Sequence, residues 1–184
     1  MQIEKINKQS IKKAIEILKS GGAVVYPTET SYGLGCDWQN KKAIQKIVKI
    51  KQRPKDKKFA VICAYKAMAA RFFKFGKLAR QLAIEYWPGP LAIVLDGTAV
   101  RVSSNDIARA LSRGLKKPIV STSANISGQG DPYDLKTIIK SFEKQRYQPD
   151  LVLDAGRLPL RKSSTIIKIE GGRIITLRQG KIKF

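Results

Sequence analysis

The chain of 184 residues is long enough to form one domain with a substantial core. It contains no histidine and only two cysteines, which excludes Ser-His-Asp and Cys-His nucleophile pairs, histidine-built metal sites and a disulfide scaffold. Its 36 Lys and Arg residues against 14 Asp and Glu give a formal net charge of +22, which attracts polyanions such as nucleotides, RNA or acidic membranes. A solvated, lysine-rich surface is the alternative explanation of this charge.

The sequence shows no sign of a membrane protein. No apolar run approaches the length of a membrane span, and the N-terminus does not resemble a signal peptide. We therefore expect a cytoplasmic protein that makes no membrane contact. Because no linker, repeat or low-complexity segment interrupts the chain, residues 1–184 are predicted to form a single domain.

The first part of the chain predicts a short strand with one helix before it and one helix after it. Ser10 is predicted to cap a helix over residues 11–19, whose apolar side chains share one face. Residues 23–26 form an apolar, β-rich run bounded by two glycines and a proline, which predicts a buried strand. A second amphipathic helix begins after Asn40 and ends near Lys51.

The remaining segments alternate between apolar strands and amphipathic helices, which is typical of a layered α/β domain. We expect a largely parallel sheet with an antiparallel contribution. The predicted strands are 59–63, 91–95, 98–102, 118–121 and 151–153, the predicted helices are 65–73, 77–86, 106–115 and 134–145, and residues 164–169 and 173–177 form a closing hairpin.

A polar loop follows the first strand. Residues 27–35 (PTETSYGLG) combine four hydroxyl side chains with two glycines, which let a ligand approach the backbone closely. Lys51 and Arg53, at the end of the following helix, would bring two cations to the same pocket, a layout suited to an anionic or zwitterionic ligand. The loop lacks the third glycine of a dinucleotide fingerprint and the Gly-Lys-Ser/Thr of a Walker A loop, so an ordinary strand-to-helix connection is the alternative.

Two later segments also place polar groups at strand ends. Residues 121–128 (STSANISG) follow a buried strand, at the place where open α/β sheets bind ligands, although they could instead cap the next helix. Residues 161–165 and 178–180 stand at opposite ends of the final hairpin. One interpretation is that the strand pair brings hydroxyls and a guanidinium together at one rim of a binding site. The alternative is an exposed basic hairpin with no such role.

In this order the segments resemble the YrdC/Sua5 family of L-threonylcarbamoyladenylate synthases. Residues 27–35 look like the family's opening motif, residues 51–54 (KQRP) match its K-x-R-P, and residues 121–128 match its S-T-S-A-N-x-S-G. The resemblance covers almost the whole chain. Further segments in the expected order are 87–90 (WPGP), 101–102 (RV), 154–156 (DAG), 164–167 (STII) and 177–180 (LRQG).

The resemblance implies an enzyme that condenses L-threonine, bicarbonate and ATP into threonylcarbamoyl-AMP and pyrophosphate. This is the first step in making N6-threonylcarbamoyladenosine in tRNAs that read ANN codons, and a separate tRNA threonylcarbamoyl transferase complex would use the product. The implied fold is a three-layer α/β/α domain (YrdC/RibB-like) around a twisted, mixed, largely parallel sheet with a concave basic face. The chain resembles the short form, which lacks an extra C-terminal domain.

The resemblance also implies residue roles. The implied catalytic residues are Lys51, Arg53, Ser123 and Asn125. Those implied to bind L-threonine are Thr30, Tyr32, Arg101 and Ser164, with Arg101 taking the carboxylate. Those implied to bind ATP are Lys51, Arg53, Lys57, Thr122, Ser123, Asn125 and Arg178. Mg²⁺ is expected to enter with ATP, because no acidic cluster supplies a dedicated metal site.

Several positions depart from the family pattern. Ser31 stands where an apolar residue is common, Ser103 stands where proline is usual, and Lys58-Phe59 replaces a common Pro-Leu. The histidine that many long-form members carry shortly afterwards is absent, which affects one expected threonine contact. Residues 96–98 form a shorter connection than usual, so part of the loop on the nucleotide side is missing or rebuilt.

Two other functions fit part of the sequence. A non-catalytic protein that binds tRNA or rRNA through a basic concave face agrees with the charge. Such an RNA-binding protein would not need the hydroxyl-rich, Lys-x-Arg and Ser-x-Asn segments that occur in this order along the chain. A carbamoyl-phosphate-using domain of the hydrogenase-maturation type is the third candidate, but such chains are much longer and rich in cysteine.

Overall fold

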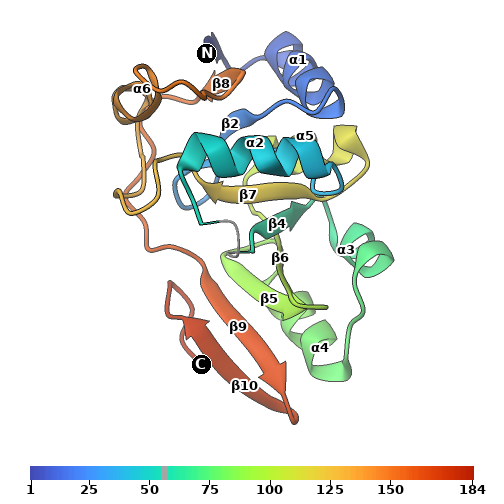
Figure 1. Cartoon of the computed structure of the whole chain (residues 1–184). Coiled ribbons are helices and arrows are strands. Elements are labelled where there is room, and N and C mark those ends of the chain that lie inside the picture. Colours follow the sequence, from blue (N-terminus) through green and yellow to red (C-terminus); the bar gives the residue numbers. More distant parts are fainter. Residues whose placement is uncertain (55–57) are drawn as a thin grey trace.

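A computed structural model describes residues 1–54 and 58–184. Within these residues the strands form one sheet in the order β1-β8-β2-β3-β7-β4-β6-β5-β9-β10, with the two termini towards opposite ends of the molecule (Figure 1). The elements are β1 (Gln2–Lys5), α1 (Lys8–Lys19), β2 (Val24–Pro27), β3 (Tyr32–Gly35), α2 (Lys41–Lys51), β4 (Ala60–Cys63), α3 (Lys66–Phe72), α4 (Lys77–Tyr86), β5 (Leu91–Leu95), β6 (Thr98–Val102), α5 (Asp106–Leu115), β7 (Ile119–Ser123), α6 (Leu135–Phe142), β8 (Leu151–Asp154), β9 (Thr165–Glu170) and β10 (Arg173–Arg178).

Helices cover both faces of this sheet. Successive residues of β2 point to opposite sides, so that Val24 packs in one apolar cluster with α1 and α5, whereas Val25 packs in another with α2 and α6. A third cluster joins α3 and α4 to β4, β5, β6 and β9. The predicted three-layer α/β/α architecture is therefore confirmed.

The predicted mixed sheet is also confirmed. Four of the described strand pairs are parallel (β1–β8, β2–β8, β4–β6 and β5–β9). Five are antiparallel (β2–β3, β3–β7, β4–β7, β5–β6 and β9–β10). The antiparallel share is thus larger than the sequence indicated, and two of the antiparallel pairs are made by β3, a strand that was not predicted.

Strand β3 lies within the segment that was predicted to be a polar loop. Tyr32–Gly35 runs back along β2, so the connection that stays outside the sheet shortens to residues 28–31. Gly35 lies close against the neighbouring strand β7, because a Cβ at this position would lie 2.2 Å from the carbonyl oxygen of Val120. The Tyr26 hydroxyl reaches across the same place and donates to that oxygen at 3.1 Å. The glycine therefore serves strand packing here.

The prediction that Ser10 caps the first helix is wrong. The helix begins at Lys8 and its cap is Asn7, whose side-chain oxygen accepts from the backbone N–H of Gln9 and of Ser10. The Ser10 hydroxyl in turn accepts from the backbone N–H of Asn7, which completes a reciprocal capping box one turn earlier than predicted. The other predicted elements are present, with ends shifted by up to three residues. Within the described residues, no helix has the length and apolar character needed to cross a membrane.

Replacing Gly35 with Ala should destabilise the fold, because the added methyl group meets a backbone carbonyl that cannot move without disturbing β7. We expect the free energy of unfolding to fall by about 1–3 kcal/mol, as for other overpacked interiors, measured by urea denaturation. Gly130→Ala is the matched control, since a Cβ there meets nothing within 4 Å. Equal stability of the two variants would contradict the close approach at Gly35.

Candidate active site

A cavity of about 460 Å³ opens among the β2–β3 connection, the end of α2, strands β4 to β7 and the β9–β10 hairpin. Segments that are far apart in the sequence therefore meet in one hollow. Of the eleven residues that the family resemblance implicates, eight line its wall: Thr30, Tyr32, Arg53, Arg101, Thr122, Ser123, Ser164 and Arg178. Lys51 and Asn125 lie behind the wall, and Lys57 lies outside the described residues.

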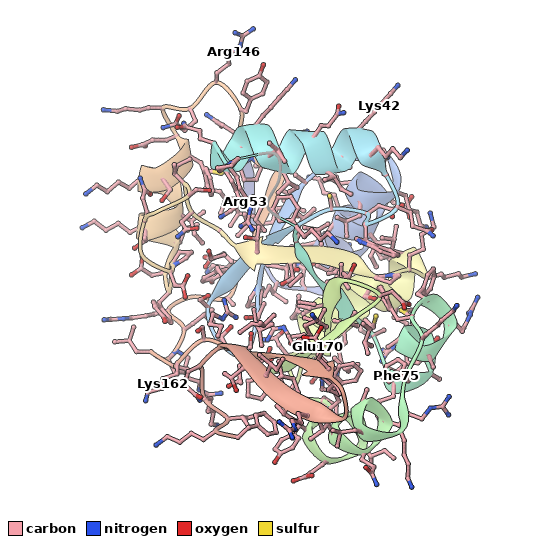
Figure 2. The ribbon with its side chains drawn as sticks, turned by 60° about the horizontal axis from the view of Figure 1, so that its bottom comes forward. Lys42, Arg53, Phe75, Arg146, Lys162 and Glu170 are labelled. Atoms are coloured by element: carbon pink, nitrogen blue, oxygen red, sulfur yellow. The ribbon has the colours of Figure 1, made fainter. Side chains whose placement is uncertain are left out.

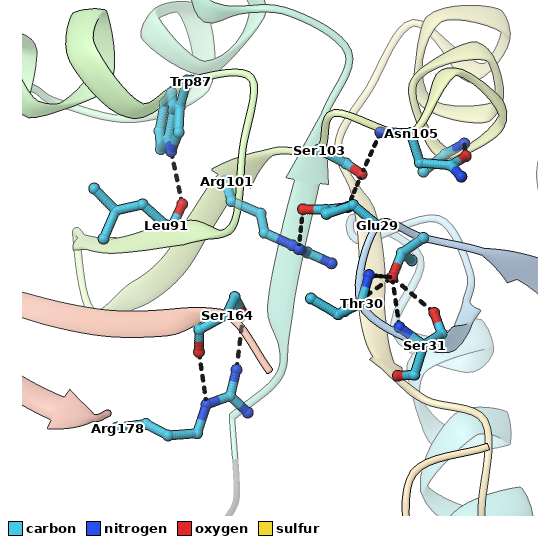
Figure 3. Close-up of polar contacts among 12 residues, drawn as sticks. Glu29, Thr30, Ser31, Trp87, Leu91, Arg101, Ser103, Asn105, Ser164 and Arg178 are labelled. Atoms are coloured by element: carbon cyan, nitrogen blue, oxygen red, sulfur yellow. Dashed lines mark hydrogen bonds and ion pairs between the residues drawn. The ribbon is translucent and has the colours of Figure 1, made fainter. Parts of the chain in front are cut away.

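Arg178 is held across the hairpin by a second predicted residue. Its guanidinium donates from Nε to the backbone oxygen of Ser164 at 3.0 Å and from Nη2 to the Ser164 hydroxyl at 2.8 Å (Figure 3). Burial, followed by the charge of Arg101, lowers the pKa of Arg178. The two guanidinium groups are thus close enough to repel, and an anion between them would relieve that repulsion.

The hairpin is anchored by a buried hydroxyl. Thr165 Oγ1 accepts from the backbone N–H of Gly180 at 3.1 Å and of Ile182 at 3.0 Å, and donates to the Ile182 carbonyl at 2.6 Å. A Cβ at Gly180 would lie 2.1 Å from the Ser163 oxygen, so the returning chain packs tightly against the start of β9. This contact fixes the end of β10 and with it Arg178.

Tyr32 lines the cavity and is itself fully buried. Its hydroxyl donates to the Gly156 carbonyl at 2.8 Å and accepts from the Ala155 N–H at 2.8 Å. Burial raises the pKa of this hydroxyl. Because both hydrogen bonds go to backbone groups of the 154–156 segment, Tyr32 shapes the wall and its hydroxyl is already engaged.

Lys51 lies behind the wall rather than in it. The side chain is only 2% exposed, and its Nζ donates to the backbone oxygens of Ser123 at 2.6 Å and Asn125 at 2.8 Å and to Asn125 Oδ1 at 2.9 Å. Asn125 continues the network by donating to the carbonyls of Gln129 at 2.6 Å and Gly130 at 2.9 Å. Together these residues hold the segment after β7 in place.

The electrostatic state of Lys51 follows from this position. Burial, followed by the nearby charge of Arg53, lowers the pKa of the Lys51 ammonium from 10.5 to about 8, and the Asp131 carboxylate opposes this shift. A lysine with such a pKa is partly neutral at mildly alkaline pH. Arg53 itself lines the cavity, packs over the Phe59 ring at 4.8 Å and donates from Nη2 to the Lys58 carbonyl at 3.1 Å.

Sequence reasoning missed three groups that the structure brings to the site. Ser121 and Asp131 line the cavity, and Asp131 is the one acidic side chain in its described wall. Glu29 pairs with Arg101 at 2.5 Å between nitrogen and oxygen, with both side chains almost fully buried. Glu29 and Ser121 were inside motifs already singled out, but their residue types carried no separate signal. Asp131 follows such a motif in a segment with no predicted element.

The sequence as a whole was compared with known proteins. A family model described as "Telomere recombination", for the Sua5, YciO and YrdC proteins, matches residues 16–180. The chain belongs to the YrdC/Sua5 family. A family relative from Methanocaldococcus jannaschii, provisionally named threonylcarbamoyl-AMP synthase, is 33% identical over 99% of this chain and 93% of its own length.

Solved structures of family members agree with the fold. P. abyssi Sua5, crystallised in complex with L-threonine, matches with a TM-score of 0.86 and 28% identity over 97% of this chain. E. coli YciO matches with a TM-score of 0.82 and 29% identity over 97% of this chain and 93% of its own length. The chain spans 56% of the length of the P. abyssi protein, so it corresponds to a part of that relative.

The Lys51 environment predicts a pH-dependent stability difference between the wild type and Lys51→Met. Above pH 8 the folded protein loses the Lys51 proton while the unfolded chain keeps it up to its ordinary value of 10.5. The unfolded state then binds more protons, so stability rises with pH. Relative to Lys51→Met, we expect the wild-type free energy of unfolding to increase by about 2 kcal/mol between about pH 8 and 10.

Urea denaturation of both proteins at several pH values in this window measures the effect, and taking the difference cancels other groups that titrate there. A wild-type–variant difference that stays constant with pH would contradict the lowered pKa of Lys51.

Proposed function

We propose that this protein is an L-threonylcarbamoyladenylate synthase, a nucleotidyltransferase that converts L-threonine, bicarbonate and ATP into threonylcarbamoyl-AMP and pyrophosphate for tRNA modification in the cytoplasm. The observation that carries this proposal is the single cavity in which Thr30, Arg101 and Ser164 meet Arg53 and Arg178. Its volume of about 460 Å³ is that of a small-molecule site. Support also comes from the family membership and from the threonine complex of P. abyssi Sua5.

The proposed chemistry needs positioning and charge neutralisation. The amine of threonine combines with bicarbonate to give a carbamate and water. A carbamate oxygen then attacks the α-phosphorus of ATP while the bond to pyrophosphate breaks in line. Such transfers require oriented cations rather than a histidine base. A guanidinium donates two parallel hydrogen bonds to a carboxylate or phosphate, so we assign the amino-acid carboxylate to Arg101 and the phosphates to Arg53 and Arg178.

The residues after β7 belong to the nucleotide side in this proposal. Thr122 and Ser123 line the cavity and offer hydroxyls to phosphate or ribose. Lys51 and Asn125 support these residues from behind. The Lys51 ammonium already donates to three oxygens, so direct contact of Lys51 with a phosphate requires this arrangement to change when ATP binds.

Mg²⁺ is proposed to enter as part of the ATP substrate. Among the residues that the structure describes, no three Asp, Glu, Cys or His side chains group to hold a metal ion. Asp131 offers one carboxylate at the wall, a ligand type that Mg²⁺ accepts beside phosphate oxygens and water.

Purified protein should release pyrophosphate only when ATP, L-threonine and bicarbonate are all present. Arg53→Ala should lower this rate by about 100-fold or more, because a charge-neutralising donor is lost from the wall of the cavity. Lys42→Ala is the matched control, since Lys42 is an exposed cation of α2, the helix just before Arg53, and it points away from the site (Figure 2). Threonine-independent release, or an unchanged rate in Arg53→Ala, would contradict the proposal.

A contact with tRNA is a second proposal, and it is compatible with the first. The exposed ring of Tyr147 has two cations near it, with Lys49 Nζ 5.2 Å and Arg146 Cζ 5.5 Å from the ring centroid, and it does not line the cavity. An aromatic face flanked by cations suits a stacked base beside phosphates. Through such a contact the protein would meet tRNA or the downstream transferase complex.

If this contact exists, tRNA binding in a filter or fluorescence assay should weaken at least about 10-fold when salt rises from about 50 to 200 mM. Tyr147→Ala should weaken binding while pyrophosphate release stays at the wild-type rate. Binding that is insensitive to both changes would exclude this surface.

A further inference from the structure

A buried network stands behind the amino-acid end of the cavity. Arg101 Nη1 donates to Glu29 Oε1 at 2.5 Å, and the Ser103 hydroxyl donates to Glu29 Oε2 (Figure 3). The Ser103 oxygen accepts from the backbone N–H of Asn105 at 3.1 Å, next to the start of α5. The contacts therefore form one chain from the helix start to the guanidinium, and the Glu29 carboxylate at its centre accepts from both the Ser103 hydroxyl and Arg101.

The members of this network constrain one another because they are buried. The side chains of Arg101 and Glu29 are 7% and 6% exposed, and Ser103 is fully buried. A buried charge without its partner is strongly unfavourable, so each group of the ion pair fixes the other. Since Ser103 accepts from an N–H, its own proton is left for the carboxylate, which determines the direction of this hydrogen bond.

Glu29 does not line the main cavity. It lines an adjoining hollow of about 250 Å³, and Thr28 and Thr30 separate the two spaces because they line both. Arg101, by contrast, lines the main cavity and has five N–H donors in a planar fork, of which Nη1 is used on Glu29. Glu29 can therefore influence a ligand in the main cavity through Arg101.

A second cation in the cavity adds to the need for such a partner. Arg178 lies near enough for its ionisation to respond to the charge of Arg101. A flexible Arg101 would turn away from Arg178. A guanidinium that has turned can no longer donate two parallel hydrogen bonds to a carboxylate. A carboxylate fixed on the opposite side holds the fork against the repulsion.

We propose that Glu29, held by Ser103, is the positioning residue that aims the Arg101 guanidinium at the carboxylate of the amino-acid substrate and thereby sets the affinity for that substrate. This inference rests on the proposed function, in which Arg101 binds the threonine carboxylate. Its effect should be greatest at the amino-acid end, because the Glu29 carboxylate accepts from Arg101 and Ser103, whereas Arg53 and Arg178 make their hydrogen bonds to other residues.

Two variants separate orientation from charge. Ser103→Ala keeps both charges and removes one donor to Glu29, so the KM for L-threonine should rise roughly 5- to 10-fold. Glu29→Gln keeps an acceptor and removes the charge, so the same KM should rise roughly 10- to 100-fold. For both variants the KM for ATP and kcat should stay within about two-fold of wild type, since uniform binding of one substrate is what changes.

Asp106→Asn is the matched control, because it removes the acid of an exposed ion pair with Arg109 on α5 and should leave every constant unchanged. Thermal unfolding of each variant verifies folding. If Glu29→Gln fails to fold, Ser103→Ala still tests the proposal, since it removes only one hydroxyl.

A second ligand separates positioning from a general structural effect. L-Threoninol has CH₂OH in place of the carboxylate, so it cannot accept two parallel hydrogen bonds from the Arg101 guanidinium. Calorimetric binding should show that both variants lose affinity for L-threonine but bind L-threoninol like the wild type. Equal losses for both ligands, or wild-type affinity for L-threonine in both variants, would overturn the proposal.

The outcomes also distinguish this inference from the proposed function. A wild type that releases threonine-dependent pyrophosphate, together with variants of unchanged threonine KM, overturns the inference alone. A wild type that binds L-threonine and releases no pyrophosphate, together with variants that bind L-threonine weakly, overturns the proposed reaction and supports the role of Glu29. A wild type that does not bind L-threonine overturns both.

Discussion

Like charges that share one small hollow repel, and the organisation of this site follows from the way the protein contains that repulsion. Arg53, Arg101 and Arg178 line the cavity, and the buried ammonium of Lys51 lies directly behind it. Each is restrained by oxygen atoms: the Lys58 carbonyl for Arg53, Glu29 Oε1 for Arg101, two oxygens of Ser164 for Arg178, and three oxygens of Ser123 and Asn125 for Lys51. The wall is preorganised for an anion, and little reorganisation is needed when one binds.

The sheet supplies the precision that this arrangement requires. Arg101 belongs to β6, which is paired on one side with β4 and on the other with β5. The loop that carries Thr30 is short because β3 turns back immediately along β2. Side chains that stand on paired strands, or on short connections between them, are placed more exactly than those on long loops. The sheet therefore fixes the positions of the cationic side chains that the proposed function assigns to two different anionic groups.

Local patterns predicted most of the elements, and long-range contacts decided the rest. The apolar periodicity of α2 and α5 was sufficient to locate both helices, since amphipathic repeats are a local property. The strand Tyr32–Gly35 resembled a loop because it contains two glycines, and only contacts from other strands explain them: the Tyr26 ring lies against both, and the Val120 carbonyl lies against Gly35. Lys51 matched a motif for ligand contact, yet its position depends on oxygens 72 and 74 residues away. Glu29 carried no signal because its role arises from partners on β6 and beyond.

The two ends of the cavity lie on strands that differ in stability, because one is at the edge of the sheet and the other is in its interior. Arg178 closes β10, the outermost strand at one margin of the described sheet, whereas Arg101 stands on an interior strand. Backbone hydrogen bonds at a margin open more readily than those in the middle of a sheet. If the proposed function holds, warming should weaken phosphate binding at Arg178 before amino-acid binding at Arg101, so that the protein passes through a state that still holds one substrate and has released the other.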